Sequence, residues 1–333
     1  MTSADSQFGR KISAIVANDS TGIELADFRL VFDVQAADQE SPNNLALRVY
    51  NLSAETVLRI TSGGEYKRLV VNAGYESNFG VIFDGTVKQF RIGRDNPKET
   101  YLDILAADWD IGYNFGFVNT SLQNPTPGQV ARAAVQAMID EEIKANPTLR
   151  RTAEDALTLG DFADKDHVPM LRGKVLFGMA RARLRDIAST LDATWSIQDG
   201  VVQILPQRGY SNDAQVSINR LTGMIGVPEQ TPSGIVVKCL LNPRIRVGGV
   251  ILLNSDDINQ LMQADPNGAP VPYNQYTGFQ HNTRVSSGAD GAYRVYAIEH
   301  EGDTRGQAWY STLTCLAMDL SEKDAAKQVI AKN

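Results

Sequence analysis

Regular alternation of apolar and polar side chains constrains the fold of this sequence more than any other feature. In FRLVFDV, residues 28–34, large apolar side chains occupy every second position. Successive side chains of a strand point to opposite faces, so this period predicts a strand with one buried face. Further strands are expected at 12–16, 45–49, 66–73, 81–92 and 99–107. Such strands with one short helix among them predict a small closed antiparallel barrel or a sandwich.

The hydrophobic period changes within SPNNLALRVYNLSAETVLRI, residues 41–60. Residues 45–49 alternate as in a strand, whereas the apolar residues after Ser53 are spaced as in a helix. Ser53 is suited to cap that helix, and Glu55 would place negative charge in its first turn, where the helix dipole favours it. Leu52 and Val57 occupy the two positions of a hydrophobic staple. The segment predicts a strand that runs directly into a short helix.

Residues 113–210 have a different pattern, which indicates an α/β insert. Thr126 and Gln129 occupy the two positions of a capping box, so a helix is expected from Pro127 to the proline at 147. A second helix is expected over 175–191, where apolar residues recur at helical spacing. In TWSIQDGVVQIL, the pair Asp199-Gly200 predicts the tight turn of a β-hairpin.

Strand-like alternation returns after residue 210 and suggests a repeat of the first third. LDILAAD (102–108) and LTCLAMD (313–319) share the pattern L-x-x-L-A-x-D, and each closes a strand–turn–strand unit. Chance could produce this match, but its equivalent placement favours a duplicated barrel. A projecting loop is expected at 254–291, and Ser321 opens a polar C-terminal helix. The expected domains are a first barrel at 1–112, the insert at 113–210, a second barrel at 211–320 and a tail helix at 321–333.

Composition excludes several classes of function. The net charge of −7 and the pI near 5.1 argue against a general nucleic-acid binder, which usually carries a basic surface. Cys239 and Cys315 lie in apolar strand-like runs and are expected to be buried reduced thiols without a disulfide. No signal peptide is recognisable, and no run approaches the ~20 apolar residues of a membrane span. We expect a soluble protein that folds in a cytoplasm.

The sequence predicts no catalytic residue, no metal ligand and no cofactor site. HEGDT at 300–304 lacks the second histidine of a zinc-protease motif, and no phosphate-binding or nucleophile motif occurs. DPNG at 265–268 and DNP at 95–97 lack the further acidic residues of a calcium loop, so both predict turns. We expect the histidines to be satisfied core or surface residues; they are His167, His281 and His300.

Clusters of charge are expected to be solvated surface. The pairs Asp256–Asp257 and Glu141–Glu142 could in principle serve a glycosidase, but exposure in a loop or on a helix face explains them better. Arg181 and Arg185 would share a helix face, where solvation or a salt bridge to a partner is favoured over a nucleic-acid contact. The tryptophans at 109, 195 and 309 border strand segments and are expected to anchor a core or an interface.

Three segments resemble baseplate hub proteins of bacteriophages with contractile tails. The opening FGRKISAIVAN…IELADFRLVFDV…SPNNLALRVYNLSAET resembles the start of that family. RGKVLFGMARARLRDIASTLDATWSIQDGVVQILPQ is similar to its helix-and-hairpin section, and TGMIGVPEQTPSGIVVKCLLNPRIRVGGVILL to the start of its second barrel. The resemblance implies a mainly β fold, with two tail-tube-like antiparallel β-barrels and an α+β insert. It also implies a homotrimer at the tail tip with a structural role.

A symmetry argument accompanies the resemblance. A tail tube consists of six-fold rings, whereas a puncturing spike is three-fold, and three subunits with two similar barrels each would match both. Implied partners are the tail tube, spike, tape measure and baseplate wedge proteins, in a virion assembled in the host cytoplasm. DNA would cross the channel without specific binding, which an acidic protein favours. Two alternatives remain open: a tail-tip hydrolase of the cell envelope and a carbohydrate-binding β module.

Overall fold

The computed structural model describes residues 8–18, 21–62, 66–145, 157–160, 162, 169–207, 209–211, 215–231, 234–253 and 291–318. The expected loop at 254–291, except its last residue, and the expected helix at 321–333 lie outside these residues. The elements are β1 (Arg10–Ala17), β2 (Gly22–Glu24), β3 (Leu30–Ala37), β4 (Asn44–Tyr50), α1 (Ala54–Thr61), β5 (Arg68–Tyr75), β6 (Asn78–Arg94), β7 (Thr100–Ala107), α2 (Asp110–Phe115), β8 (Phe117–Leu122), α3 (Pro127–Ala145), β9 (Thr158–Leu159), β10 (Lys174–Met179), α4 (Ala180–Thr190), β11 (Ala193–Gln198), β12 (Val201–Pro206), β13 (Val216–Ile218), the 3₁₀-helix η1 (Arg220–Thr222), β14 (Met224–Thr231), β15 (Gly234–Leu240), β16 (Val250–Leu253), β17 (Ala292–Asp303) and β18 (Trp309–Ala317).

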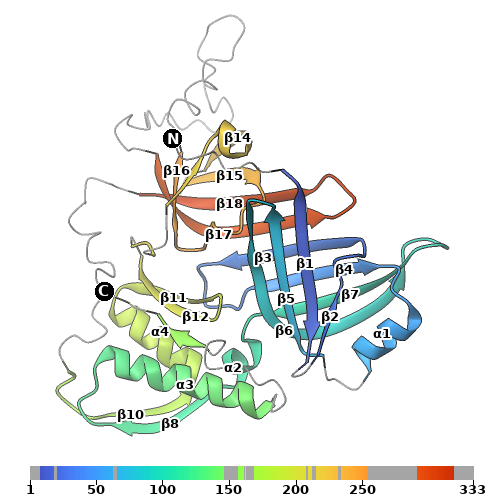
Figure 1. Cartoon of the computed structure of the whole chain (residues 1–333). Coiled ribbons are helices and arrows are strands. Elements are labelled where there is room, and N and C mark those ends of the chain that lie inside the picture. The colour runs from blue at the N-terminus through green and yellow to red at the C-terminus, as the bar shows by residue number, and fades with distance from the viewer. Residues whose placement is uncertain are drawn as a thin grey trace, which may run out of the picture.

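Most strands belong to one 13-stranded sheet. Its main path is β14-β15-β18-β17-β3-β4-β7-β6-β5-β1-β2, and β16 joins it beside β17 with β13 on its far side. All neighbours in this sheet are antiparallel except β13 and β16, which are parallel. Figure 1 shows β1 and β5 crossing over β4 and β7, with the insert at lower left. The mainly antiparallel β fold with few helices confirms the predicted fold class.

Three hydrophobic cores lie within this architecture. The first is enclosed by β1 and β3 to β7, the second lies in the insert around α3 and α4, and the third lies among β15 to β18. The tryptophans at 109, 195 and 309 are each at most 2% exposed, which confirms their predicted role as anchors. The domain boundaries derived from the sequence remain a prediction.

The predicted corner at Ser53 is confirmed. The strand β4 ends at Tyr50, and α1 begins at Ala54 after Ser53, whose Oγ accepts a hydrogen bond from the backbone N–H of Thr56 at 3.1 Å. This bond satisfies one of the N–H groups that the first turn of a helix leaves free. On the inner side of α1, Ile60 is fully buried in the first core. The corner therefore sets a helix against the wall of the first β region.

Replacing Ser53 with alanine should lower the free energy of unfolding by about 1 kcal/mol, because the cap is lost. Chemical denaturation followed by circular dichroism measures the change. Ser53→Asp is the matched control, since an aspartate can accept the same hydrogen bond and should retain most of the stability. A Ser53→Ala protein as stable as the wild type would contradict a stabilising cap at this corner.

Local signals also position the insert. The reciprocal capping bonds between Thr126 and Gln129 are present, with N–H to oxygen distances of 3.3 and 3.0 Å, and α3 begins at Pro127 as predicted. Asp199 and Gly200 have φ values of 50° and 76°. Positive φ at both central residues is the requirement of the tight turn predicted between β11 and β12.

The predicted helix over 175–191 is wrong in its first part. The strand β10 occupies Lys174–Met179, and α4 starts only at Ala180. β10 pairs with β8, a strand that the sequence analysis did not predict. Leu176 is buried, whereas Val175 and Phe177 on either side of it are exposed. Because apolar residues lie on both faces of β10, apolar and polar residues do not alternate along it. The sequence pattern therefore favours the start of a helix over a strand.

Candidate functional site

The two β-rich regions are joined edge to edge by β3 and β17. Their pairing runs from Ala37 opposite Ala297 to Val31 opposite Asp303, and this contact is called the inner seam below. Within it Gly302 lies against the ring of Phe32, and a Cβ atom at 302 would come within 2.2 Å of that ring. An ion pair of 2.8 Å between Arg29 and Asp303 closes one end. The regions that the sequence predicts as separate barrels therefore share one sheet.

Strand order repeats on the two sides of the inner seam. One side has the order β14-β15-β18-β17 and the other has β3-β4-β7-β6. In both groups the first and second strands along the chain take the first and second places, the third strand takes the fourth place, and the last strand inserts between them at the third place. At the inner seam, β17 in the fourth place of one group pairs with β3 in the first place of the other.

Details of register also agree between the two groups. A β-bulge interrupts β6 after Val87 and β17 after Val295, in each case where the strand pairs with its hairpin partner. The Arg48 guanidinium lies 3.9 Å from the centre of the Tyr101 ring, and the Lys238 ammonium 4.5 Å from that of Tyr310. Both cations come from the second strand of their group and both tyrosines from the neighbouring hairpin strand. Tyr101 and Tyr310 are therefore structurally equivalent.

This equivalence differs from the alignment that the L-x-x-L-A-x-D pattern suggests. If Tyr101 corresponds to Tyr310, then Leu102 corresponds to Ser311, whereas the sequence match pairs Leu102 with Leu313. The displacement is two residues, one full period of a strand. Both leucines therefore still face a core, where they are at most 1% exposed.

The outward face of the inner seam is acidic. On this face Asp33 lies opposite Glu301, and Glu299 lies two residues before Glu301 on the same strand. Burial raises the pKa of Asp33, a hydrogen bond from Gln35 opposes this, and the charge of Glu301 adds to it. Burial also raises the pKa of Glu299, and the charges of Asp33 and Glu301 add to that shift. Like charges opposite one another destabilise a sheet, so this concentration of carboxylates is unfavourable for folding.

Asp33→Asn should raise the free energy of unfolding by about 0.5 kcal/mol at pH 7, the scale of a partly exposed charge pair. The folded pKa of Asp33 lies above the unfolded value, so this carboxylate destabilises the protein only while it is ionised. As the pH falls through the folded pKa, the wild type regains this stability and the gain of the variant should vanish. Chemical denaturation at pH 7 and pH 3 measures this. Asp27→Asn, at an exposed aspartate, is the control.

Both outer edges of the repeated groups are open among the residues described. The strand β6 pairs with β5 only up to Thr86, and from Lys88 to Arg94 it pairs with β7 alone. At the other end, β14 pairs with β15 alone. Open edges present unpaired backbone N–H and C=O groups, which can pair with another chain.

A buried ion pair behind the inner seam joins both β regions to the insert. The side chains of Asp38, just after β3, and Arg294, on β17, are only 2% and 4% exposed. The Asp38 carboxylate also accepts hydrogen bonds from Thr194 at 3.1 Å and Ser196 at 3.2 Å, both on β11. Arg294 donates to two backbone carbonyls at the end of β12. Burial lowers the pKa of Arg294, an effect that the charge of Asp38 opposes.

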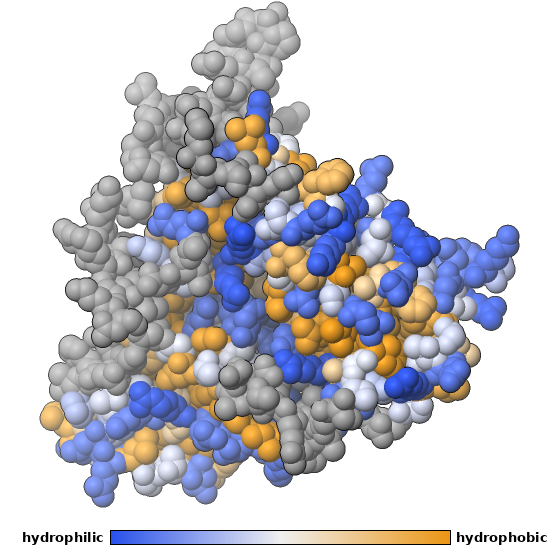
Figure 2. Space-filling model, viewed as in Figure 1, coloured by the Kyte–Doolittle hydropathy of each residue, from blue (hydrophilic) through white to orange (hydrophobic). Residues whose placement is uncertain are grey.

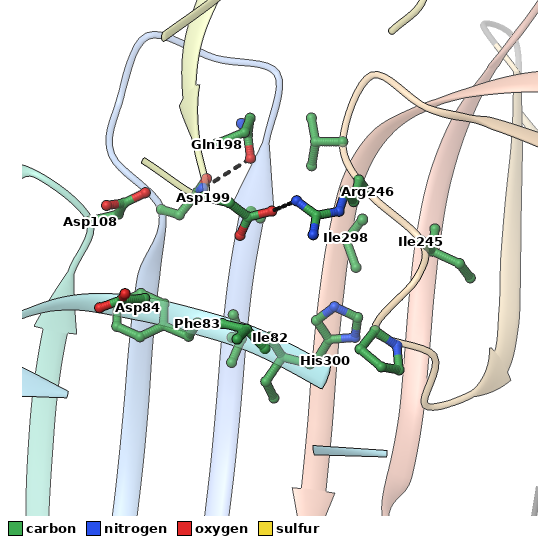
Figure 3. Close-up of a pocket in the computed structure, with 16 residues that line it drawn as sticks. Ile82, Phe83, Asp84, Asp108, Gln198, Asp199, Ile245, Arg246, Ile298 and His300 are labelled. Atoms are coloured by element: carbon green, nitrogen blue, oxygen red, sulfur yellow. Dashed lines mark hydrogen bonds and ion pairs between the residues drawn. The ribbon is translucent and has the colours of Figure 1, made fainter. Parts of the chain in front are cut away.

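A small cavity lies at the same junction (Figure 3), with a volume of about 40 Å³. Above it, Arg246 reaches from the second β region to Asp199 in the turn of the insert. His300 lies at its floor, donates to or accepts from Ser311 at 2.8 Å, and has its pKa lowered by burial to about 4. A space of this volume holds a few water molecules at most, which is the scale of a gap in a structural contact.

The described residues show the surroundings of several groups singled out in the sequence. His300 is a satisfied core residue, as predicted, whereas His167, His281 and Asp256–Asp257 lie outside those residues. Glu142 corrects a prediction: it is 3% exposed rather than solvated, and it accepts hydrogen bonds from Thr86 and from the N–H of Gly112. Within the described ranges no three potential metal ligands come together, and no helix is long and apolar enough to cross a membrane.

The arginines of α4 make contacts within the chain, rather than the solvated face or salt bridge to a partner that the sequence favours. Arg185 forms a two-pronged ion pair with Glu40, just beyond β3, and Arg181 bonds to the end of α2. Arg183 pairs with Asp186 one turn further along the helix. Cys239 and Cys315 are free and buried, and burial raises the pKa of each thiol to about 12.

Comparison with known proteins identifies the fold. No family model and no curated protein matches the chain. Among solved structures, the tail protein from Neisseria meningitidis MC58 aligns with 94% of this chain and 98% of its own, with a TM-score of 0.54 and 10% identity. A 43 kDa tail protein of prophage MuSo2 from Shewanella oneidensis covers 92% and 97%, with a TM-score of 0.49 and 6% identity. An E. coli type VI secretion component described as similar to T4 tail proteins covers 94% and 77%, at 0.49 and 11%. The first similarity shows that the chain shares the fold of a tail protein, as the resemblance to baseplate hubs predicts.

Proposed function

We propose that this chain is the structural baseplate hub of a phage tail, and that three copies form a ring with pseudo-six-fold symmetry. The ring would adapt a six-fold tail tube to a three-fold spike. The observation that carries the proposal is the repeated strand order on either side of the inner seam, with open edges at both ends. If β6 of one copy pairs with β14 of the next, each contact between copies repeats the inner seam. We call that contact the outer seam.

Charges at the two open edges support this pairing. Arg91 lies four residues after Val87, and Glu299 lies four residues after Val295, the residues that precede the two bulges. Arg91 therefore takes the place of Glu299. Glu229 on β14 takes the place of Asp33 on β3. Glu229 lies opposite the residue two positions before Lys238, and Asp33 lies opposite the residue two positions before Arg48. In the outer seam the repelling pair Glu299 and Asp33 is thus replaced by an arginine and a glutamate. Diagonal neighbours in a sheet are within reach of such long side chains.

The same ring would give the protein a conduit for DNA. The inward face of the shared sheet packs on the chain's own cores, so the outward face is free to line a channel. This face carries Asp33, Glu299 and Glu301, and negative charge there would repel phosphates in transit. The tail tube, tape measure, spike and baseplate wedge proteins would be its partners in the virion.

Charge reversal at the outer seam tests the ring. In sedimentation at increasing concentration, the wild type should reach the mass of three copies. Arg91→Glu should weaken assembly at least tenfold, because it places a like charge diagonal to Glu229. Glu229→Arg should do the same, and the double reversal should restore assembly. Arg59→Glu reverses an exposed charge on α1, outside both edge strands, and is the matched control.

Several outcomes would contradict the ring. Three results would each exclude it. The first is a protein that stays monomeric at all concentrations, the second is a particle of six copies, and the third is assembly that neither charge reversal weakens. A zymogram on purified peptidoglycan addresses the hydrolase alternative, since clearing by the purified chain would be incompatible with a purely structural role.

A further inference from the structure

The two-stranded sheet of β8 and β10 has apolar side chains on both faces. Its inner face carries the buried Val118 and Leu176, and α3 and α4 pack nearby. On its outer face Phe117, Val175 and Phe177 are 48%, 71% and 65% exposed. In Figure 2 apolar surface interrupts the hydrophilic colour at lower left, where Figure 1 places these strands. A solvated face of an antiparallel sheet is normally polar, so this face is suited to a partner.

The exposed residues form a coherent surface. The rings of Phe117 and Phe177 meet edge to face, with centroids 5.1 Å apart. Phe115 and Leu171, which precede β8 and β10 in the chain, are also exposed, at 63% and 94%. A pair of aromatic rings held together in this way is a typical anchor for a protein contact.

The open edge of β10 offers a place for an additional strand. Among the described residues, β8 and β10 pair only with each other. Gly178 in β10 has a φ of 129°, and a Cβ atom there would have no atom within 4 Å. Among the described residues, nothing therefore covers β10 at Gly178, and glycine within a strand often marks a close approach of another backbone.

Charge selects the kind of segment that would fit this edge. Arg172 and Lys174 lie at the start of β10, and no acidic residue occurs from 169 to 185. Successive residues of β10 point to opposite faces of the sheet. Lys174 therefore points to the same face as Leu176, opposite to the face of Phe177. A strand added here would place apolar residues beside Val175 and Phe177 and carboxylates on the side of Lys174.

We propose that the edge of β10 binds, by strand addition, an extended segment of a partner protein in which apolar and acidic residues alternate. Backbone hydrogen bonds to the open edge would hold the segment, and the alternating side chains would give specificity. This contact uses neither β6 nor β14, so it stands or fails independently of the ring.

A peptide of six residues, the length of β10, with alternating valine and glutamate tests the proposal on the full chain by fluorescence anisotropy. It should bind saturably and at least tenfold tighter than its valine–lysine counterpart. Phe177→Ser and Lys174→Glu should each weaken binding at least tenfold. Leu58→Ser, at a position 63% exposed on α1, should change it less than twofold. Unchanged denaturation midpoints establish that the variants are folded.

Other results would overturn the proposal. Absence of saturable binding, equal binding of the lysine peptide, or full binding by both β10 variants would each do so. Self-association that Phe177→Ser abolishes would assign the surface to a second copy of this chain. Sedimentation with anionic vesicles that Phe177→Ser abolishes would assign it to a lipid surface.

Discussion

Replacing Asp38 with alanine should lower the free energy of unfolding by about 3–5 kcal/mol, the cost of removing one partner from a buried ion pair. The change leaves the guanidinium of Arg294 charged in a site where it is only 4% exposed. It also removes the acceptor for the hydroxyls of Thr194 and Ser196. Chemical denaturation measures the loss. Since Asp38 contacts both the insert and the second β region, the variant should unfold in separate transitions for the insert and the β regions.

A double-mutant cycle separates the ion pair from its surroundings. Arg294→Met alone should also destabilise, because it leaves the carboxylate of Asp38 buried without its counter-ion. The double variant Asp38→Ala with Arg294→Met removes both charges and should be less destabilised than the sum of the single changes by at least 1 kcal/mol. Asp84→Ala is a control, because its partner Arg68 and its own side chain are both partly exposed and its loss should cost less. Strict additivity would show that the pair is not coupled.

Sequence reasoning succeeded where the determinant is local. The cap at Ser53, the box of Thr126 and Gln129 and the turn at Asp199-Gly200 each depend on residues a few positions apart. Their chemistry is readable without knowing the rest of the fold. The resemblance to baseplate hubs added the fold class, which alternation alone left between a barrel and a sandwich.

Sequence patterns do not predict the features that depend on contacts between distant segments. Pairing of β3 with β17 joins residues more than 250 positions apart, and nothing in either strand specifies its neighbour. β10 was mistaken for a helix because its outer face is apolar, the same property that makes it a candidate binding edge. Glu142 was expected to be solvated because sequence does not show that a helix face meets Thr86 and Gly112. The L-x-x-L-A-x-D match found the repeated hairpins but not their register, since a period of two tolerates such a shift.

Trp309→Ala should destabilise the protein by about 3–5 kcal/mol, the usual cost of truncating a buried aromatic residue. The side chain is 1% exposed and belongs to β18, in the second β region, yet it lies in the core of the first. Its ring meets that of Phe32 edge to face at 5.4 Å, and its indole N–H donates to the carbonyl of Gly74 at 3.2 Å. The cavity should therefore loosen both regions, and amide hydrogen exchange should accelerate in β3 and β5 as well as in β18.

Trp195→Ala is the matched control, because Trp195 is equally buried but lies within the core of the insert. It should cost a similar free energy while accelerating exchange mainly in β11, β12 and α4. If Trp309→Ala accelerated exchange only in β15, β17 and β18, the two β regions would unfold independently. The inner seam would then be too weak for a contact of the same geometry to join two copies. If both regions loosen together, the seam is a rigid joint. Contacts of the same geometry between copies could then hold a ring against the load of a tail.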